Sequence, residues 1–453
     1  MKTKYIIHLL GLTVFLLSTV SCKKFLETKA IQTQSVPESL NDLQLLLDNP
    51  IMQSGLNAVN SSSDEYYVTY TNWLSLTDVI NKREYVWDAE VINLSDWNSA
   101  YKNILFANTV LFYLDQVSGT GTAELARNIK GHALFVRAYF FYLMAQSTAP
   151  QYDPATASTD LGIVLRLDPD FNKETVRSTA RQSYEQMIND LESALNLLPD
   201  VQLYKTRPGK AACLALLAKV YLQMGDFEKS RGYADASLKI TSNLIDFNSL
   251  TTTAAYPLGN FNNNIELLYY SKASLQVPLN GDETRARVDS VLYRTFADDD
   301  LRKKAFFRDN GNKTFTFKGS YTGDRTLFNG IAVDEIYLIR AECNARLNNA
   351  NAAMGDLNTL LGKRWVSGKF NPYANLSAEQ VLPIILQERR KELLYRGTRW
   401  SDLKRLNKDS RFAVTLKREL NGEVYLLPPN DLRYSALLPV ELLSLTNLQQ
   451  NPR

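Results

Sequence analysis

The chain has 453 residues, of which 45% are hydrophobic and 22% charged, and its formal net charge is +3. That length allows a large core and exceeds what a single compact core usually holds. The near-neutral charge gives no electrostatic case for nucleic acid as a partner. With two histidines and three cysteines in the sequence, neither a His/Cys metal site nor a Cys–His nucleophile pair is expected. We therefore predict no metal, no cofactor and no catalytic residue.

The N-terminal segment has the three parts of a secretory signal. A basic start precedes an apolar run over residues 6–17, and four small residues stand directly before Cys22. The apolar run is too short to span a membrane stably. A cysteine at the cleavage point predicts a bacterial lipoprotein signal and lipidation of Cys22, although Thr19 stands where such signals usually carry Leu. The alternative is an ordinary secretory signal with an incidental cysteine.

Helical periodicity dominates the rest of the chain. We predict helices over residues 39–48, 97–117, 124–146, 183–197, 210–224, 227–240, 334–347, 350–361 and 377–406. Residues 57–96 and 241–329 are irregular, and the second of these segments contains strand-like alternation at residues 313–317. The predicted fold class is therefore mainly α, with loop-rich insertions and minor β structure.

Two helical pairs have the pattern of tetratricopeptide hairpins. In the first pair, Ala218 and Ala234 lie where the two helices would cross, and Gly225 lies at the turn. Small crossing residues and a turn residue that tolerates a left-handed backbone are what tight antiparallel helices need. Ala341 and Asn348 repeat this register after a long insertion. Generic antiparallel helices are the alternative interpretation.

The segment 387–405 is densely charged along one predicted helix. Arg389 falls within its apolar stripe, and since an unpaired buried charge is very costly, we expect it to meet a carboxylate or several carbonyls. Helix spacing also predicts ion pairs of Glu392 with Arg396 and of Asp402 with Arg405. These ion pairs explain the acidic residues better than acid–base catalysis does.

This segment and several others resemble the SusD/RagB family of outer-membrane lipoproteins from Bacteroidetes. The resemblance covers nearly the whole chain and rests on residues 21–27, 135–141, 160–165, 334–342, 387–405, 438–441 and 450–452. Arg396 and Ser401 depart from the acidic and aromatic residues that are usual at those positions.

The resemblance implies a tetratricopeptide-like helical scaffold that binds glycan fragments, or peptides, and catalyses no reaction. It implies a SusC-like TonB-dependent transporter as partner and a lipid-anchored position on the outer membrane, facing the cell exterior. We accordingly divide the chain into a signal peptide (1–21), an anchor and tether (22–37) and a SusD-like domain (38–453) with parts meeting near residue 240. The alternative function is a periplasmic tetratricopeptide-type lipoprotein that assists protein assembly.

A cluster of aromatic residues in the first irregular segment is the candidate ligand platform. An aromatic ring offers stacking area, and neighbouring polar groups can fix the orientation of hydroxyls. The predicted ligand-binding residues are Tyr66, Tyr67, Tyr70, Asn72 and Trp73. The alternative is that several of these rings belong to the core. Secondary candidates in the second irregular segment are Tyr269, Tyr270 and Tyr321.

Overall fold

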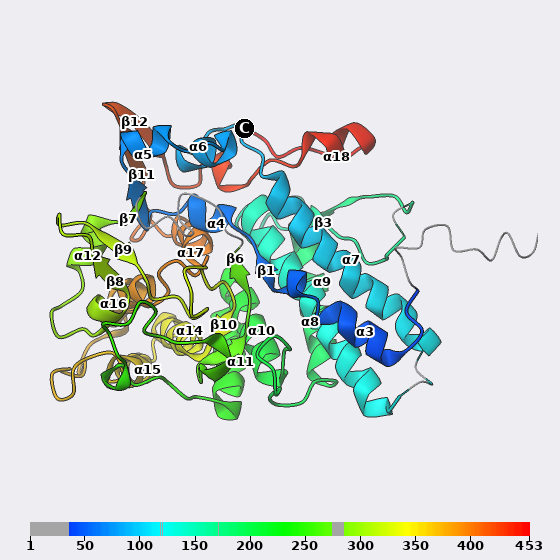
Figure 1. The fold of residues 1–453 in the computed structure, drawn as a ribbon, viewed down its shortest axis with the longest axis horizontal. Coiled ribbons are helices and arrows are strands. Elements are labelled where there is room, and N and C mark those ends of the chain that lie inside the picture. The colour runs from blue at the N-terminus through cyan, green and yellow to red at the C-terminus, as the bar shows by residue number, and fades with distance from the viewer. Residues whose placement is uncertain (1–35, 118, 120, 171, 274–284) are drawn as a thin grey trace, which may run out of the picture. The chain divides into compact units, whose positions relative to one another are not determined.

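The computed structural model describes residues 36–117, 119, 121–170, 172–273 and 285–453, so the predicted signal peptide and Cys22 lie outside the described residues. Residues Ser39–Arg453 form one unit, and its regular structure is predominantly helical, as predicted (Figure 1). None of the helices in the described part is long and apolar enough to cross a membrane.

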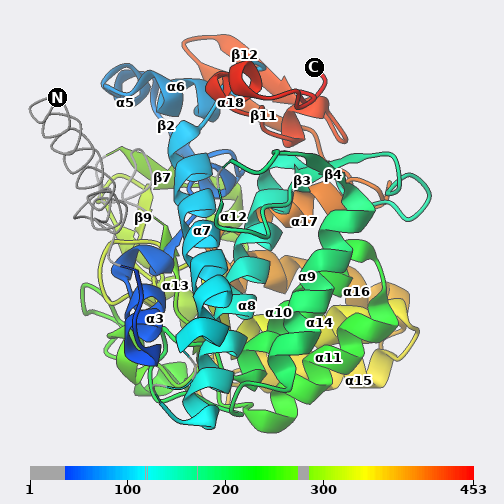
Figure 2. The same ribbon diagram turned by 90° about the vertical axis from the view of Figure 1, so that its right-hand side faces the viewer.

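The scaffold of the unit is an array of helices in which each helix packs against the next (Figure 2). Its members are α7 (Leu94–Val117), α8 (Ala123–Thr148), α9 (Ala180–Leu195), α10 (Lys210–Met224), α11 (Phe227–Ile240), α14 (Val333–Arg346), α15 (Ala350–Leu361) and α16 (Ala378–Glu392). Except for α16, these bounds lie within three residues of the predicted ones. The packing of α11 on α14 joins helices from the two sides of residue 240.

The two predicted hairpins are α10–α11 and α14–α15, and both turn by the same backbone motif. Gly225 and Asn348 adopt left-handed φ values of 75° and 59°. In each turn two backbone N–H groups donate back to carbonyls of the last helical turn, which closes a Schellman motif. Where α10 crosses α11, Ala218 and Ala234 are fully buried, and the Ser230 hydroxyl donates to the Ala218 carbonyl at 2.8 Å. These small residues allow the close approach that the sequence predicted.

Strands are short and occur as six two-stranded sheets in the described part of the chain. The pairs are β1 (Ser54–Gly55) with β6 (Lys272–Ala273), β2 (Tyr66–Val68) with β7 (Ala286–Val288), β3 (Leu161–Val164) with β4 (Arg177–Thr179), β5 (Leu267–Tyr269) with β10 (Ile331–Ala332), β8 (Phe307–Asp309) with β9 (Phe315–Phe317), and β11 (Leu416–Leu420) with β12 (Glu423–Leu427). Strand β9 confirms the predicted alternation. Asn421 and Gly422, with φ of 51° and 83°, form the two-residue turn between β11 and β12 that such a hairpin favours.

The single helix predicted over residues 377–406 is wrong. The chain forms α16, ending at Glu392, and a separate α17 (Arg399–Leu406). Tyr395 and Gly397 between them take left-handed φ values of 59° and 71°, which no α-helix accommodates. The break turns Arg396 away from Glu392, so the predicted pair of these two residues does not form.

The first irregular segment holds more helix than predicted. It contains α4 (Ala58–Ser61), α5 (Tyr70–Leu74) and α6 (Val79–Tyr85) around strand β2. The Thr69 hydroxyl accepts from the Asn72 backbone N–H at 3.2 Å, and the Asp78 carboxylate accepts from the Ile80 N–H at 2.8 Å. These side-chain caps start helices too short for a periodicity argument to detect.

Buried ion pairs connect the helices to the loop-rich region. Arg302 and Arg364 are fully buried and both bond Glu392, at 3.0 Å and 2.7 Å. Arg364 also reaches Glu266 at 2.8 Å. Since these charges lie in the interior, they interact strongly with one another and are costly to leave unpaired. The network, which we call the Arg364 network, holds α16 to segments more than 80 residues away in the chain.

Arg389 pairs as expected from its place in an apolar stripe. Its Nε donates to Asp402 at 2.8 Å and its Nη2 to Glu335 at 3.4 Å. Asp402 in turn pairs with Arg405 at 2.9 Å, which confirms that predicted pair. Arg396 instead forms a two-point pair with Asp334 of α14, at 2.6 Å and 3.1 Å.

Glu84 is a buried carboxylate with which no cation pairs among the residues that the structure describes. Its Oε1 accepts from the Asn93 amide at 2.7 Å, while Oε2 has no hydrogen-bond partner there. Burial, reinforced by the nearby Asp96, raises the pKa of Glu84 to about 8. The side chain is therefore protonated at neutral pH.

Replacing Arg364 by Met should lower the free energy of unfolding by about 3–5 kcal/mol, because Glu266 and Glu392 would lose a buried guanidinium. Arg411→Met is the matched control, since the Arg411 side chain is 55% exposed and its partner Asp409 is 24% exposed, and ion pairs at the surface contribute at most about 1 kcal/mol. Urea titration of both variants measures the difference. Equal stability of the two would contradict a structural role for the Arg364 network.

Replacing Glu84 by Gln should change how stability depends on pH. The pKa of Glu84 is raised in the folded state, so between its unfolded value of about 4.5 and its folded value of about 8 the native protein binds the extra proton, and its stability falls as pH rises. The slope from this group is about 1.4 kcal/mol per pH unit. Melting temperatures measured from pH 5 to 9 should show that the stability of the variant relative to the wild type increases as pH rises. A difference between the two proteins that does not change with pH would refute this.

Candidate functional site

A cavity of about 430 Å³ opens beside β2 and β11. Its volume lies within the range typical of ligand pockets, roughly 300–1,000 Å³. Five segments supply its walls: β2, the residues after α6, the start of α12 (Ser290–Arg294), α16, and residues 414–419 around β11. The cavity thus exists only when segments more than 300 residues apart come together.

Arg418 fixes β11 against the wall of this cavity. Its guanidinium stands over three rings, with centroid distances of 3.8 Å to Tyr85, 4.5 Å to Trp87 and 5.1 Å to Tyr66. It donates to the backbone carbonyls of Tyr85 and Ser61 and, at 2.6 Å, of Ser63. A planar guanidinium suits this combination of stacking and carbonyl bonding.

The backbone of Trp87, whose ring lies against Arg418, is strained. Trp87 has a φ of 53°, which is rare for a bulky residue and costs free energy. Its indole N–H donates to the Ser62 carbonyl at 2.8 Å, and its ring packs against Arg418. These contacts hold the backbone in a conformation in which Trp87 lines both this cavity and a second, smaller one.

Asp64 is a charged residue of the wall. Arg399 holds it at two points, 2.6 Å and 2.9 Å, and Arg390 bonds it at 3.0 Å. Burial alone would raise the pKa of Asp64, but the two guanidiniums outweigh it and hold the pKa well below its usual range. Burial and the charge of Asp64 together raise the pKa of the neighbouring Glu65 to about 8.

The structure divides the predicted ligand-binding residues into two groups. Tyr66 and Tyr67 line the cavity, but Tyr66 is 3% exposed and donates to the Ser61 carbonyl at 2.7 Å, so its ring is largely core. Tyr67 faces the other side of β2 and is partly exposed. Tyr67 is therefore the ring of β2 best placed to meet a ligand.

The remaining predicted residues lie on α5, directly after β2. Tyr70 is 38% exposed and stacks on Trp73, with centroids 6.1 Å apart. The Trp73 indole donates to the Lys82 carbonyl at 3.2 Å, and the Asn72 amide donates to the Arg285 carbonyl at 3.2 Å. Tyr70 thus presents a ring face to solvent, while Trp73 and Asn72 mainly support it.

The prediction of further ligand-contacting rings in the second irregular segment is wrong. Its candidates are at most 3% exposed: Tyr269, Tyr270 and Tyr321. Tyr321 donates to Glu266 and, at 3.0 Å, to Asp334, which makes it part of the buried charge network. Burial removes these rings from any surface platform.

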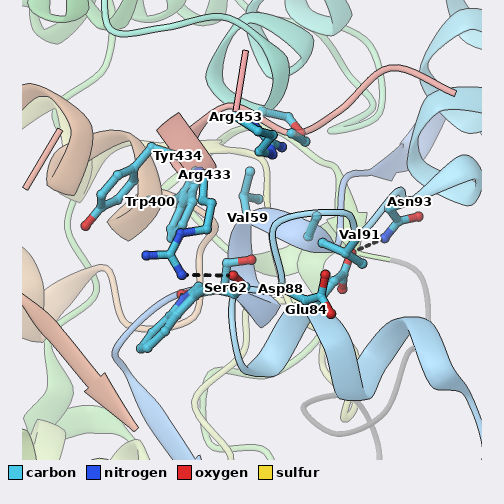
Figure 3. Close-up of a pocket in the computed structure, with 14 residues that line it drawn as sticks. Val59, Ser62, Glu84, Asp88, Val91, Asn93, Trp400, Arg433, Tyr434 and Arg453 are labelled. Atoms are coloured by element: carbon cyan, nitrogen blue, oxygen red, sulfur yellow. Dashed lines mark hydrogen bonds between the residues drawn. The ribbon is translucent and has the colours of Figure 1, made fainter. Parts of the chain in front are cut away.

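Figure 3 shows a second cavity, which is too small for an organic ligand. Its volume of about 50 Å³ has room for one or two water molecules, each of which occupies about 30 Å³ in the liquid. Glu84 and Tyr434 line it, and both have a buried oxygen without a partner in the described part of the chain. We therefore regard it as a water-sized cavity and not as a ligand site.

Sequence reasoning missed the charged residues of the large cavity. Arg418 lies in the alternating pattern of β11, in which Leu416, Arg418 and Leu420 are buried while the residues between them are exposed. An arginine on the buried face of a strand was the available signal. The sequence contained no comparable signal for Arg390, because nothing in the pattern distinguishes it from the other charged residues of the same helix.

The elements α5, α6, β12 and α18 (Val440–Leu445) lie at one end of the unit (Figures 1 and 2), and the residues of this end include exposed apolar side chains. We call this set the apolar end. Its members, each at least 38% exposed, are Tyr70, Leu74, Val79, Val424, Leu426, Leu432, Val440 and Leu445. Exposed apolar area of this kind marks interaction surfaces more often than isolated residues do.

Comparisons with known proteins identify relatives of the chain. A family model described as "Starch-binding associating with outer membrane" matches residues 24–222, and the SusD family model matches residues 333–433. A SusD-like protein P2 from Formosa agariphila is 29% identical over 136 residues, which are 30% of this chain and 25% of that relative. The match therefore spans about a quarter of the relative's length.

Solved structures share the fold. A SusD superfamily protein from Bacteroides thetaiotaomicron is 21% identical and superposes with a TM-score of 0.74 over 92% of this chain and 100% of the other. A SusD-like carbohydrate-binding protein from Bacteroides vulgatus is 20% identical, with a TM-score of 0.65 over 90% and 96%. The two family matches follow one another along the chain and the fold agrees with both. The chain therefore belongs to the SusD/RagB family of non-catalytic binding proteins associated with the outer membrane.

Proposed function

We propose that this protein is a lipid-anchored, cell-surface protein that binds glycan fragments in the cavity beside β2 and β11. It would deliver them to a SusC-like TonB-dependent transporter. The observation that supports a ligand at this place is a 430 Å³ cavity with Tyr67 in its wall. Glycan as ligand class is supported by the starch-binding description of the matching family model and by the carbohydrate-binding relative.

The aromatic residues suit a sugar. A pyranose ring has apolar C–H faces and polar edges, so it stacks on an aromatic ring while its hydroxyls bond to neighbouring polar groups. Tyr67 in the cavity and the Tyr70–Trp73 stack on α5 could contact successive sugar rings of one chain. Arg390, Lys417 and Glu419 in the wall could bond hydroxyls.

The transporter would dock on the apolar end of the unit. This end carries exposed apolar side chains from α5, β12 and α18, and a stable complex needs to bury surface of this kind. The lipid at Cys22 would confine the protein to the membrane that holds the transporter. A peptide ligand and a periplasmic assembly role are the alternatives that the following experiments address.

Tyr67→Ala and Tyr70→Ala should each weaken binding of an oligosaccharide that the wild type captures from a glycan array. Loss of one stacking ring costs about 1–2 kcal/mol, or roughly 5- to 30-fold in Kd. Tyr204→Ala is the matched control, because Tyr204 is 53% exposed and lines a separate, small cavity. Titration calorimetry measures the affinities. Unchanged affinity in both site variants would exclude this platform, and capture of peptides alone would favour the peptide alternative.

Cys22→Ala should release the protein from the membrane fraction, because a cleaved and lipidated cysteine would be its anchor. Protease added to intact cells should digest the wild-type protein if it faces the cell exterior. Immunoblots of fractions and of protease-treated cells measure both effects. Full protection of the wild type in intact cells would instead support the periplasmic assembly role.

A further inference from the structure

The cavity beside β2 and β11 contains a carboxylate that two cations share. Asp64 accepts two hydrogen bonds from Arg399 and one, at 3.0 Å, from Arg390. One negative charge cannot neutralise two guanidiniums, so this part of the wall keeps a net positive charge. Of the two arginines, Arg390 lines the cavity and is the more exposed, with 26% of its side chain accessible against 13% for Arg399.

The neighbouring acidic group does not correct this imbalance. Glu65 follows Asp64 in the chain and is buried, and its raised pKa of about 8 leaves it protonated at neutral pH. Its carboxyl instead accepts from the Ser63 hydroxyl at 3.2 Å and from the Tyr395 N–H at 3.3 Å. Asp64 therefore remains the one ionised carboxylate that pairs with either arginine in the described part of the chain.

Arg418 is a further cation of the same wall, and it has no acidic partner in the described part of the chain. Arg418 bonds three backbone carbonyls and stacks on rings, and none of these contacts carries a negative charge. At the rim, Lys417 and Glu419 pair with each other at 3.3 Å and cancel. Asp289 is the remaining acidic residue of the wall, and its carboxylate caps α12 by accepting from the Leu292 N–H at 2.7 Å.

We propose that the cavity selects an acidic glycan, and that Arg390 binds the carboxylate or sulfate group of one sugar residue. This rests on the proposed glycan-binding function and names the class of glycan. A guanidinium presents parallel N–H donors that match both anions. The Nε–H of Arg390 is buried and has no hydrogen-bond partner in the described structure, so the guanidinium retains a donor that a ligand could satisfy. Tyr67, in the same cavity, would carry the ring of the acidic sugar.

The test measures binding by the full-length lipoprotein in detergent. The probes are uronic acid oligomers, sulfated galactose oligomers and uncharged oligomers of the same length. We expect at least one acidic probe to bind at least about tenfold more tightly than its uncharged counterpart, as one charge-assisted contact provides. That preference should shrink when NaCl is raised from low to high concentration, because salt screens partly exposed charges. The sugar that binds distinguishes carboxylate from sulfate.

Variants then locate the effect. Arg390→Gln should remove the preference for the acidic probe, because the variant removes the charge-assisted contact, and it should weaken binding of the acidic probe more than binding of the uncharged one. Arg411→Gln removes an exposed arginine elsewhere and should change neither affinity. Arg390→Lys keeps the charge and should retain part of the preference. Melting temperatures of the variants show whether each is folded, and the salt dependence of the wild type tests the proposal even if Arg390→Gln is not.

Each outcome separates the two proposals. Binding of uncharged probes without any preference for acidic ones, or a preference that survives in Arg390→Gln, would overturn the role of Arg390 and leave glycan binding intact. Absence of binding to every glycan would overturn the proposed function and this inference together.

Discussion

The fold depends on pairing charges in its interior. Arg302 and Arg364 have no access to solvent, and both are satisfied by Glu392 at the last position of α16. A buried charge is tolerated only when its partner is present. The segments that contribute charges must therefore all be in their native positions at the same time. The Arg364 network therefore ties the loop-rich region to the helical array, which apolar packing alone would do less specifically. Directly beyond the end of α16, Arg396 adds a further buried pair with Asp334.

The same helix links this interior to the candidate site. Arg389 and Arg390 are adjacent in sequence and point to different partners: Arg389 to Asp402 in the interior and Arg390 to Asp64 at the cavity. Successive residues on a helix project about 100° apart, so neighbouring arginines can serve a core and a surface. A rigid helix anchored on one face thus positions the charge that faces the cavity. This is the arrangement that precise binding requires.

Much of the fold could be predicted because its signals are local. Periodicity located the long helices, and the turn residues Gly225 and Asn348 located the two hairpins, since only residues that tolerate positive φ close such turns. The same reasoning failed between α16 and α17. There the apolar stripe continues through the break, where Tyr395 and Gly397 take left-handed φ values and Arg396 bonds Asp334. The candidate site was predictable in part: the aromatic cluster marked β2 and α5, but not which ring would be buried. Tyr66 and Tyr67 are alike in sequence and differ only in the face of a two-stranded sheet that they occupy.

The sequence by itself determined the helical class, the two hairpins, the need of Arg389 for a carboxylate and the resemblance that the family matches confirm. Each of these follows from short-range spacing or from the cost of burying a charge. The tertiary structure alone decided which carboxylate pairs with which arginine, and that β2, α16 and β11 enclose one cavity. Those choices involve residues more than 300 positions apart, such as Asp64 with Arg390 and Ser63 with Arg418. No local pattern encodes them, because they depend on how the whole chain satisfies its buried charges at once.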